Sequence, residues 1–309
     1  FIMSTQFEAF KNKVEHCLCA PGDGVYTVNT AKERKAALRN KLYGQTENVD
    51  NLWRESLNEL PNSPHKAVML GISSDCGGGI LRGANWGPLF VRSALIDQQP
   101  QCHSFDLGDV RVIPHLLHDK YLNDATISNC QKALYGNEDN DYYVSPLSIT
   151  EDVCDSFYAT FKDKGIFGIG GDHSISYPLT KAYLKAKREQ GRRTAIIHFD
   201  AHTDLLVERL GIDLCFGSWC THILEFLPAP HHLIQFGIRS SGKPKAHWEN
   251  TFGVKQHWAH EIIERGAAAV AADAIAQLKA DNVDEIYVSF DIDALDAEFA
   301  SATGTPEHH

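Results

Sequence analysis

Six short runs of mainly apolar residues recur along the chain from residue 66 onward, and each is bounded by turn-forming residues. The runs lie at 66–72 (KAVMLGI), 102–110 (CHSFDLGDV), 165–171 (GIFGIGG), 194–200 (TAIIHFD), 232–238 (HLIQFGI) and 285–293 (EIYVSFDID). Most are apolar at nearly every position, so we expect strands that are buried on both faces. Between them, apolar residues recur with the helical period at 86–97, 151–165, 177–191 and 260–281.

Strands that alternate with helices and are apolar on both faces are typical of a mostly parallel sheet covered by crossover helices. We therefore predict an α/β fold of three layers, α-β-α, around a mostly parallel sheet. Residues 1–64 lack this alternation, and helical patterns at 30–44 and 51–60 indicate an N-terminal helical extension. Residues 65–309 are expected to form one further domain.

Composition narrows the class of protein. The chain has 309 residues, 43% of them hydrophobic, which is enough for a substantial core. A formal net charge of -11 without a basic block argues against nucleic-acid or anionic-membrane partners. No apolar run approaches a membrane span or the core of a signal peptide. We expect a soluble, cytoplasmic protein whose eight cysteines, which lack CxxC spacing, are reduced thiols.

Potential metal ligands follow three of the predicted strands, at the point where each strand ends. These segments are GGDHS (170–174), DAHTD (200–204) and DIDALD (291–296). In open parallel sheets, ligands bind beyond the carboxyl ends of the strands. The three segments are therefore expected to face one site.

Asp200, His202 and Asp204 stand at alternate positions, so in an extended chain they would project to one side. Carboxylates this close raise each other's proton affinity unless a cation lies between them. Asp291 and Asp293 repeat the spacing. Taken singly, each segment also fits a simpler interpretation, namely a tight turn, a capping side chain or a solvated acidic strand end.

The candidate ligands are four carboxylates and two imidazoles: His173, Asp200, His202, Asp204, Asp291 and Asp293. This set is too large for one tetrahedral zinc site, which takes three or four protein ligands. It fits two divalent ions. Oxygen-rich ligation with imidazole makes two Mn²⁺ the first choice, with nickel, cobalt or iron as alternatives.

Four motifs resemble those of the ureohydrolase family, which comprises arginases, agmatinases and formimidoylglutamases. They are GGDHSIS (170–176), FDAHTD (199–204), SFDIDALD (289–296) and ATGTPE (302–307). Weaker similarity covers LRGANWGPLFVRSAL (81–95) and FGIRS (236–240). The resemblance spans roughly residues 66–309 and makes this region the catalytic domain. It implies an arginase-like fold and a homo-oligomer, either a trimer or a hexamer.

Carried over by motif, the resemblance assigns the six ligands to bridging or single-ion roles: Asp200 and Asp291 bridge, His173 and Asp204 complete one ion, and His202 and Asp293 complete the other. Two such ions acidify water, which attacks the sp² carbon of a guanidino or formimino group. Asp204 would also pass a proton to the leaving nitrogen. The implied substrate is a small amidine or guanidino compound.

Departures from the family bear on the substrate. Phe216 stands where arginases and agmatinases have a histidine, and Leu205 stands near the place of an arginase-type asparagine. Formimidoylglutamases share both features, so N-formimino-L-glutamate, hydrolysed to L-glutamate and formamide, is the predicted substrate. Arg239 would bind its carboxylate or, alternatively, support the strand end by bonding to the scaffold.

Other observations keep rival interpretations open. Formimidoylglutamases more often carry Glu after the histidine of the first motif, where this chain has Ser174. An arginase, an agmatinase or another guanidino-acid ureohydrolase would release urea instead. A catalytically silent member that binds metal is the alternative from another class. Because family members continue beyond the last motif, we also expect the C-terminal part of the domain to be missing.

Overall fold

The computed structural model describes residues 2–24, 31–78, 81–99, 104–136 and 140–308. The chain divides into two compact units. Unit 1 contains Phe1–Gly77 and Arg82–Leu179, and unit 2 contains Gly78–Leu81 and Thr180–His309.

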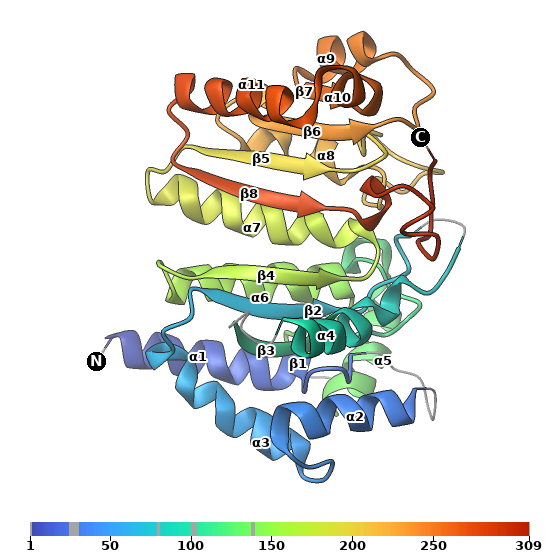
Figure 1. The fold of residues 1–309 in the computed structure, drawn as a ribbon. Helices are drawn as coiled ribbons and strands as arrows, with labels where there is room; N and C mark the ends of the chain where they lie inside the picture. Colours follow the sequence, from blue (N-terminus) through green and yellow to red (C-terminus); the bar gives the residue numbers. More distant parts are fainter. Residues whose placement is uncertain (1, 25–30, 79–80, 100–103, 137–139, 309) are drawn as a thin grey trace. The chain divides into compact units, whose positions relative to one another are not determined.

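Unit 1 is built on a sheet of four strands in the order β1-β3-β2-β4 (Figure 1). The strands are β1 (Leu18–Cys19), β2 (Ala67–Ile72), β3 (Phe105–Val110) and β4 (Gly165–Gly170). β2 runs parallel to β3 and β4, whereas β1 is antiparallel to β3. The longer helices are α1 (Ile2–Cys17), α2 (Lys32–Tyr43), α3 (Val49–Ser56), α4 (Gly87–Gln98), α5 (Asp124–Tyr135) and α6 (Pro146–Thr160). The 3-10 helices are η1 (Leu57–Asn62), η2 (Ala84–Trp86), η3 (Asp119–Tyr121) and η4 (His173–Ile175).

The N-terminal segment packs within unit 1. Phe10 of α1 is 1% exposed, and its ring centroid lies 5.9 Å from that of Phe157 in α6. β1 pairs with the end of β3 through Leu18 and Val110. The sequence interpretation missed α1, although its buried apolar residues recur at helical spacing. α2 ends as predicted at Gly44, whose φ of 68° suits a residue without a Cβ.

Unit 2 contains a second sheet of four strands, all parallel, in the order β7-β6-β5-β8. The strands are β5 (Thr194–Phe199), β6 (Leu233–Ile238), β7 (Lys255–Trp258) and β8 (Glu285–Phe290). The helices are most of α7 (Ser176–Glu189), then α8 (Trp219–Ile223), α9 (Lys245–Phe252), α10 (Ala259–Arg265) and α11 (Ala267–Ala280). Its 3-10 turns are η5 (Leu224–Phe226), η6 (Pro230–His232) and η7 (Ile292–Ala294).

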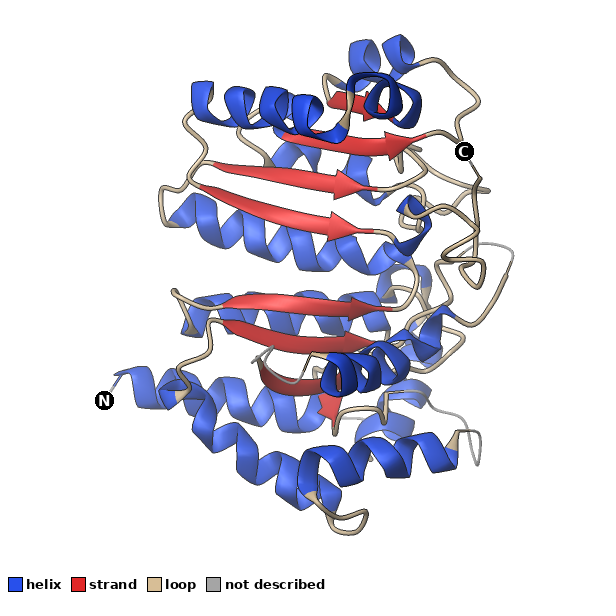
Figure 2. Cartoon of the chain, viewed as in Figure 1, coloured by secondary structure: helices blue, strands red, loops and turns tan. Residues whose placement is uncertain are grey.

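Helices cover both faces of the sheet in unit 2 (Figure 2). On one face, Ile234 and Phe236 of β6 pack against Val270 and Ala274 of α11. On the other face, Tyr183 of α7 lies against Tyr287 of β8, with ring centroids 5.4 Å apart. This layering confirms the predicted α/β class with mostly parallel strands.

Several predicted elements differ from the observed ones. The described strands form one four-stranded sheet in each unit. The predicted helix at 260–281 is two helices, because Gly266 breaks it with a φ of 83° and a ψ of 142°. α5, α9 and β7 were not predicted, and β7 (KQHW) carries no apolar run that would signal a strand.

Two expectations concern the chain as a whole. None of the helices in the described part of the chain is long and apolar enough to cross a membrane. Seven of the eight cysteines lie in the described ranges, and all seven are free thiols. Cys102 lies outside the described residues.

Candidate metal centre

The carboxyl ends of β5 and β8 bring two of the acidic segments together in unit 2. The strands pair in parallel, and Phe199, the last residue of β5, is opposite Phe290, the last residue of β8. The next residue on the β8 side, Asp291, donates its backbone N–H to the carbonyl oxygen of Phe199 at 2.9 Å. The segments that begin at Asp200 and Asp291 therefore leave the sheet side by side.

A first group of donors consists of Asp200, His202 and Asp293. One donor atom of each residue lies within 4.8 Å of the others. His202 Nδ1 lies 3.3 Å from Asp200 Oδ1 and 3.2 Å from Asp293 Oδ2. Both carboxylates are almost fully buried. Oxygen and imidazole donors at this spacing suit a divalent transition-metal ion.

The electrostatics of this group favour positive charge between the carboxylates. Burial alone would lower the pKa of His202, but its hydrogen bonds with Asp200 and Asp293 raise that pKa to about 11. Burial raises the pKa of Asp293, and the neighbouring carboxylate of Asp200 raises it further. A proton on His202 or a metal ion supplies the charge that two buried carboxylates require.

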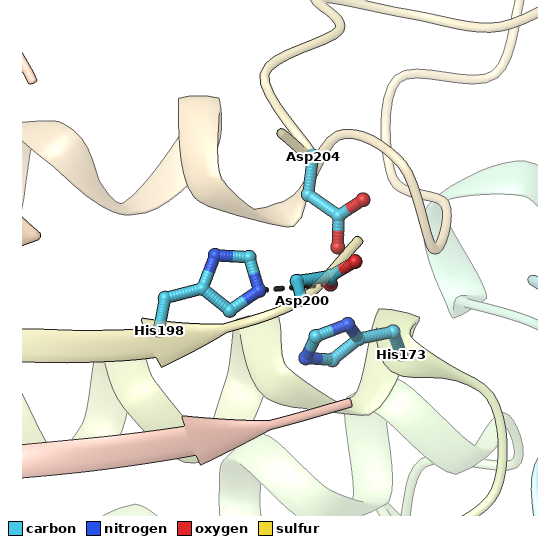
Figure 3. A group of neighbouring side chains, drawn as sticks. All are labelled: His173, His198, Asp200 and Asp204. Carbon is cyan, nitrogen blue, oxygen red and sulfur yellow. Dashed lines mark hydrogen bonds and ion pairs between the residues drawn. The ribbon is translucent and has the colours of Figure 1, made fainter. Parts of the chain in front are cut away.

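A second group in the same unit consists of His198, Asp200 and Asp204, which Figure 3 shows around the end of β5. One donor atom of each of these residues lies within 4.8 Å of the others. Trp219 of α8 donates from Nε1 to Asp204 Oδ2 at 2.8 Å. Asp200 belongs to both groups, so its carboxylate stands between two candidate ion positions.

The backbone at Asp204 supports a specialised role for this residue. Its φ is 50°, in the left-handed region that costs a residue with a side chain roughly 1–2 kcal/mol. Asp204 is also only 5% exposed. Strained, buried residues persist where the surrounding structure holds them, and such residues concentrate at functional sites.

A chain of buried polar side chains supports Asp200 from inside the sheet. His198 Nε2 lies 2.9 Å from Asp200 Oδ2, and Gln235 donates from Nε2 to His198 Nδ1 at 2.9 Å. Gln256 donates to Gln235 Oε1 at 2.8 Å, and Trp258 donates to Gln256 Oε1 at 2.8 Å. This order places the proton of the His198 ring on Nε2, directed at the carboxylate, so His198 supports Asp200 and the carboxylates of Asp200 and Asp204 are the atoms of the second group that would be open to an ion.

The sequence interpretation did not identify these supporting residues. The sequence did contain a sign of them, because His198 and Gln235 are polar residues inside otherwise apolar runs. In the structure both side chains are fully buried. Buried polar groups require partners, so such positions indicate a network behind a site.

The predicted reason for the spacing of Asp200, His202 and Asp204 was wrong. β5 ends at Phe199, and the three residues lie in the bends and loop that follow, so strand alternation does not place them. Instead, Asp200 accepts from the backbone N–H of His202 at 2.6 Å, a local turn that orients the imidazole.

The remaining two predicted ligands occupy distinct positions. Asp291 caps η7, accepting at Oδ1 from the backbone N–H of Asp293 at 3.0 Å. Among the described residues, the groups of three or more donors that could share an ion do not include Asp291. His173 lies in unit 1, where it begins η4 directly after β4, with Asp172 as the cap. Ligand roles for Asp291 and His173 stay predictions.

Residues of the C-terminal motif line the first group of donors. Thr305 donates from Oγ1 to Asp293 Oδ2 at 2.9 Å. Glu307 Oε1 lies 3.2 Å from His202 Nε2. The sequence interpretation used this segment for the resemblance and gave neither residue a role. These contacts hold the side chains of His202 and Asp293, two of the predicted ligands, in place.

Arg239 bonds to the scaffold. Its Nη2 donates to the carbonyl oxygens of Asp293, Leu295 and Glu307 at 2.7, 3.1 and 3.0 Å. Its Nη1 donates to those of Gly237 and Ala294. This arrangement matches the alternative in which Arg239 supports the strand end. Its role in binding a substrate carboxylate stays a prediction.

Comparison with known proteins identifies the family. A family model described as the arginase family matches residues 65–309. An agmatinase from Bacillus subtilis (strain 168) is 33% identical over 158 residues, which are 50% of this chain and 49% of the relative. A formimidoylglutamase from Halalkalibacterium halodurans is 40% identical over 141 residues, which are 45% of this chain and 42% of the relative. The chain spans about half the length of the curated relatives it matches.

Solved structures agree on the fold. A proclavaminate amidino hydrolase from Streptomyces clavuligerus superposes with a TM-score of 0.57 at 25% identity, covering 79% of this chain and 73% of that chain. An arginase from Bacillus subtilis superposes with a TM-score of 0.59 at 22% identity, covering 79% and 81%. The family match covers the acidic segments, the two groups of donors and most of the chain, and the protein therefore belongs to the arginase family.

Proposed function

We propose that this protein is a dinuclear metal-dependent hydrolase of a C–N bond in a linear amidine, with N-formimino-L-glutamate as the first candidate substrate. The observation that carries the proposal is the position of Asp200 in both groups of donors. A carboxylate has two oxygens, so one residue can serve two ions. When bound, the two ions supply a nucleophile from water at neutral pH.

The residues divide between holding the ions and handling protons. Asp200, His202 and Asp293 would hold one ion, and Asp200 and Asp204 would hold the other, with His173 and Asp291 as the further ligands that the family motif implies. Asp204, fixed by Trp219 through Oδ2, would hold a proton on its carboxylate and pass it to the leaving nitrogen. Mn²⁺ is the first choice for both ions, because oxygen donors dominate the set.

The choice of substrate rests on the residues around the acidic segment. Leu205 follows Asp204, and Phe216 offers no proton-transferring ring; its face instead lies 5.3 Å from the guanidinium carbon of Arg209. A relative named formimidoylglutamase shares 40% identity over the matched region, and relatives named agmatinase share 33% and 37%. Agmatine, arginine and guanidino acids are therefore the competing substrates.

A substrate panel tests this function. Protein loaded with Mn²⁺ would be incubated with N-formimino-L-glutamate, arginine, agmatine and a guanidino acid, and formamide and urea would be measured separately. We expect formamide from the first compound, loss of turnover in Asp200→Asn, and unchanged turnover in Asp273→Asn, whose carboxylate lies at the surface and pairs with Arg265. Urea release would reassign the substrate. Bound ions without any turnover would favour the silent, metal-binding alternative.

We propose three further properties of the whole protein. Residues 1–64 would form an N-terminal helical extension and residues 65–309 the catalytic domain. The protein would be cytoplasmic and would assemble as a homo-oligomer, a trimer or hexamer by family resemblance. Light scattering of the purified chain measures the oligomeric state directly.

A further inference from the structure

A cluster of two histidines and an aspartate lies at the end of unit 2 opposite the candidate metal centre. His231 and His232 belong to η6, just before β6, and Asp281 directly follows α11. His232 also contacts Thr194, the first residue of β5, whereas the acidic segment follows Phe199, its last residue. The cluster is therefore separate from the candidate metal centre.

The donor atoms of the cluster converge. His231 Nε2 lies 3.1 Å from Asp281 Oδ2, and His232 Nε2 lies 3.6 Å from the same oxygen. Two ligands held at a tetrahedral zinc ion with bond lengths of about 2.0–2.1 Å lie ~3.3 Å apart. The two observed separations bracket that value, so an ion fits between these atoms with small side-chain movements.

His232 supplies an independent reason to expect a cation. The side chain is fully buried, and Nδ1 lies 2.8 Å from the carbonyl oxygen of Thr194. A carbonyl oxygen can only accept, so Nδ1 carries the ring proton. With Nδ1 as the donor, the neutral ring presents a lone pair at Nε2.

That lone pair has no hydrogen-bond partner among the described residues. A buried acceptor without a partner destabilises the fold, and here Nε2 also faces a carboxylate oxygen at 3.6 Å. A proton on His231 would satisfy Asp281 but would leave Nε2 of His232 unbonded. A metal ion satisfies all three groups together. Metal-binding histidines characteristically donate the other ring N–H to a carbonyl oxygen, as His232 does here.

The surrounding contacts hold the cluster in place. Gln277 of α11 donates from Nε2 to the carbonyl oxygen of His231 at 2.9 Å. This bond connects the last turn of α11 to η6. The side chain of His231 is 47% exposed, which gives an ion access from solvent and leaves room for water as a fourth ligand.

We propose that His231, His232 and Asp281 form a further divalent-metal site of the zinc class that joins the end of α11 to the start of β6. Two imidazoles and one carboxylate are borderline ligands that suit Zn²⁺, and the set differs from the oxygen-rich candidate metal centre. The inference does not depend on the proposed hydrolase function.

Zinc stoichiometry tests the proposal. The full chain, stripped with a chelator, would be dialysed against Zn²⁺ alone, and bound zinc per chain would be measured by elemental analysis. The variants are His231→Ala and Asp281→Asn, both at partly exposed positions. His247→Ala, an exposed histidine of unit 2 outside the cluster, is the matched control.

We expect His231→Ala and Asp281→Asn each to bind one zinc ion per chain fewer than the unaltered protein, with His247→Ala unchanged. Circular dichroism would verify folding, and if Asp281→Asn misfolds, His231→Ala decides. Equal stoichiometry in His231→Ala and the unaltered chain would overturn the proposal. If His247→Ala also bound one zinc ion per chain fewer, the proposal would be overturned, because surface histidines in general would then hold the zinc.

Discussion

His198, inside β5, and Asp200, directly after the end of that strand, form a hydrogen bond of 2.9 Å between Nε2 and Oδ2. Neither side chain is more than 1% exposed. The histidine therefore fixes the one carboxylate that both groups of donors share. The candidate metal centre depends on this support as well as on the ligands themselves.

Gln235 is predicted to stabilise this pair. In Gln235→Leu, His198 Nδ1 loses its donor and the carbonyl oxygen of Thr203 loses another bond, of 2.6 Å. We expect the free energy of unfolding to fall by about 1–3 kcal/mol, because buried polar atoms lose their partners. Urea denaturation monitored by circular dichroism measures the change. Gln98→Leu, at an exposed position, is the control and should stay within about 0.5 kcal/mol; an equal loss in both variants would refute the prediction.

Trp219 is predicted to orient Asp204. Trp219→Phe keeps an aromatic ring in α8 but removes the N–H that donates to Asp204 Oδ2. We expect about a 10–100-fold loss in Mn²⁺ affinity or turnover with the fold retained, since residues behind metal ligands have effects of this size. Isothermal titration with Mn²⁺ provides the measurement. Trp248→Phe removes a similar N–H bond, to Ser241, and should leave Mn²⁺ affinity unchanged; equal affinity in the two variants would contradict the assigned role.

Arg239 is predicted to stabilise the fold through its hydrogen bonds to backbone carbonyl oxygens. Its guanidinium joins β6 to the segment around Asp293 and to Glu307 through backbone carbonyl oxygens. Lysine cannot reproduce this planar set of bonds, so Arg239→Lys should lower the free energy of unfolding by about 1–3 kcal/mol. Thermal unfolding would be compared with Arg265→Lys, at an exposed position. A change in KM for N-formimino-L-glutamate without a loss of stability would instead support direct binding of the substrate.

Much of the fold was predictable because local patterns determine it. β2, β3, β4, β5, β6 and β8 lie within predicted apolar runs, and positions 102 and 103 of the second run lie outside the described residues. The missed elements have other causes. β7 is polar in sequence and becomes a strand by pairing with β6, a long-range contact that no local pattern encodes. Gly266 splits the last long helix through its backbone conformation.

The candidate site was predictable at the level of residue types and strand ends. Asp200, His202 and Asp293 do converge, because neighbouring parallel strands end at one edge of the sheet. The hydrogen bond from Gln235 to His198 and the contact of Glu307 with His202 could not be predicted from the sequence, because folding brings these distant side chains together. The positive φ of Asp204 likewise follows from the loop and not from strand alternation.

The shared carboxylate of Asp200 is the central claim, and Mn²⁺ stoichiometry tests it most directly. Mn²⁺ bound per chain would be measured by equilibrium dialysis for the unaltered protein and for Asp200→Asn, Asp204→Asn and Asp293→Asn. We expect two ions in the unaltered chain, about one in Asp204→Asn and Asp293→Asn, and none in Asp200→Asn, because only Asp200 serves both positions. If Asp200→Asn bound as many Mn²⁺ ions per chain as Asp204→Asn or Asp293→Asn, the claim that Asp200 serves both ion positions would be wrong.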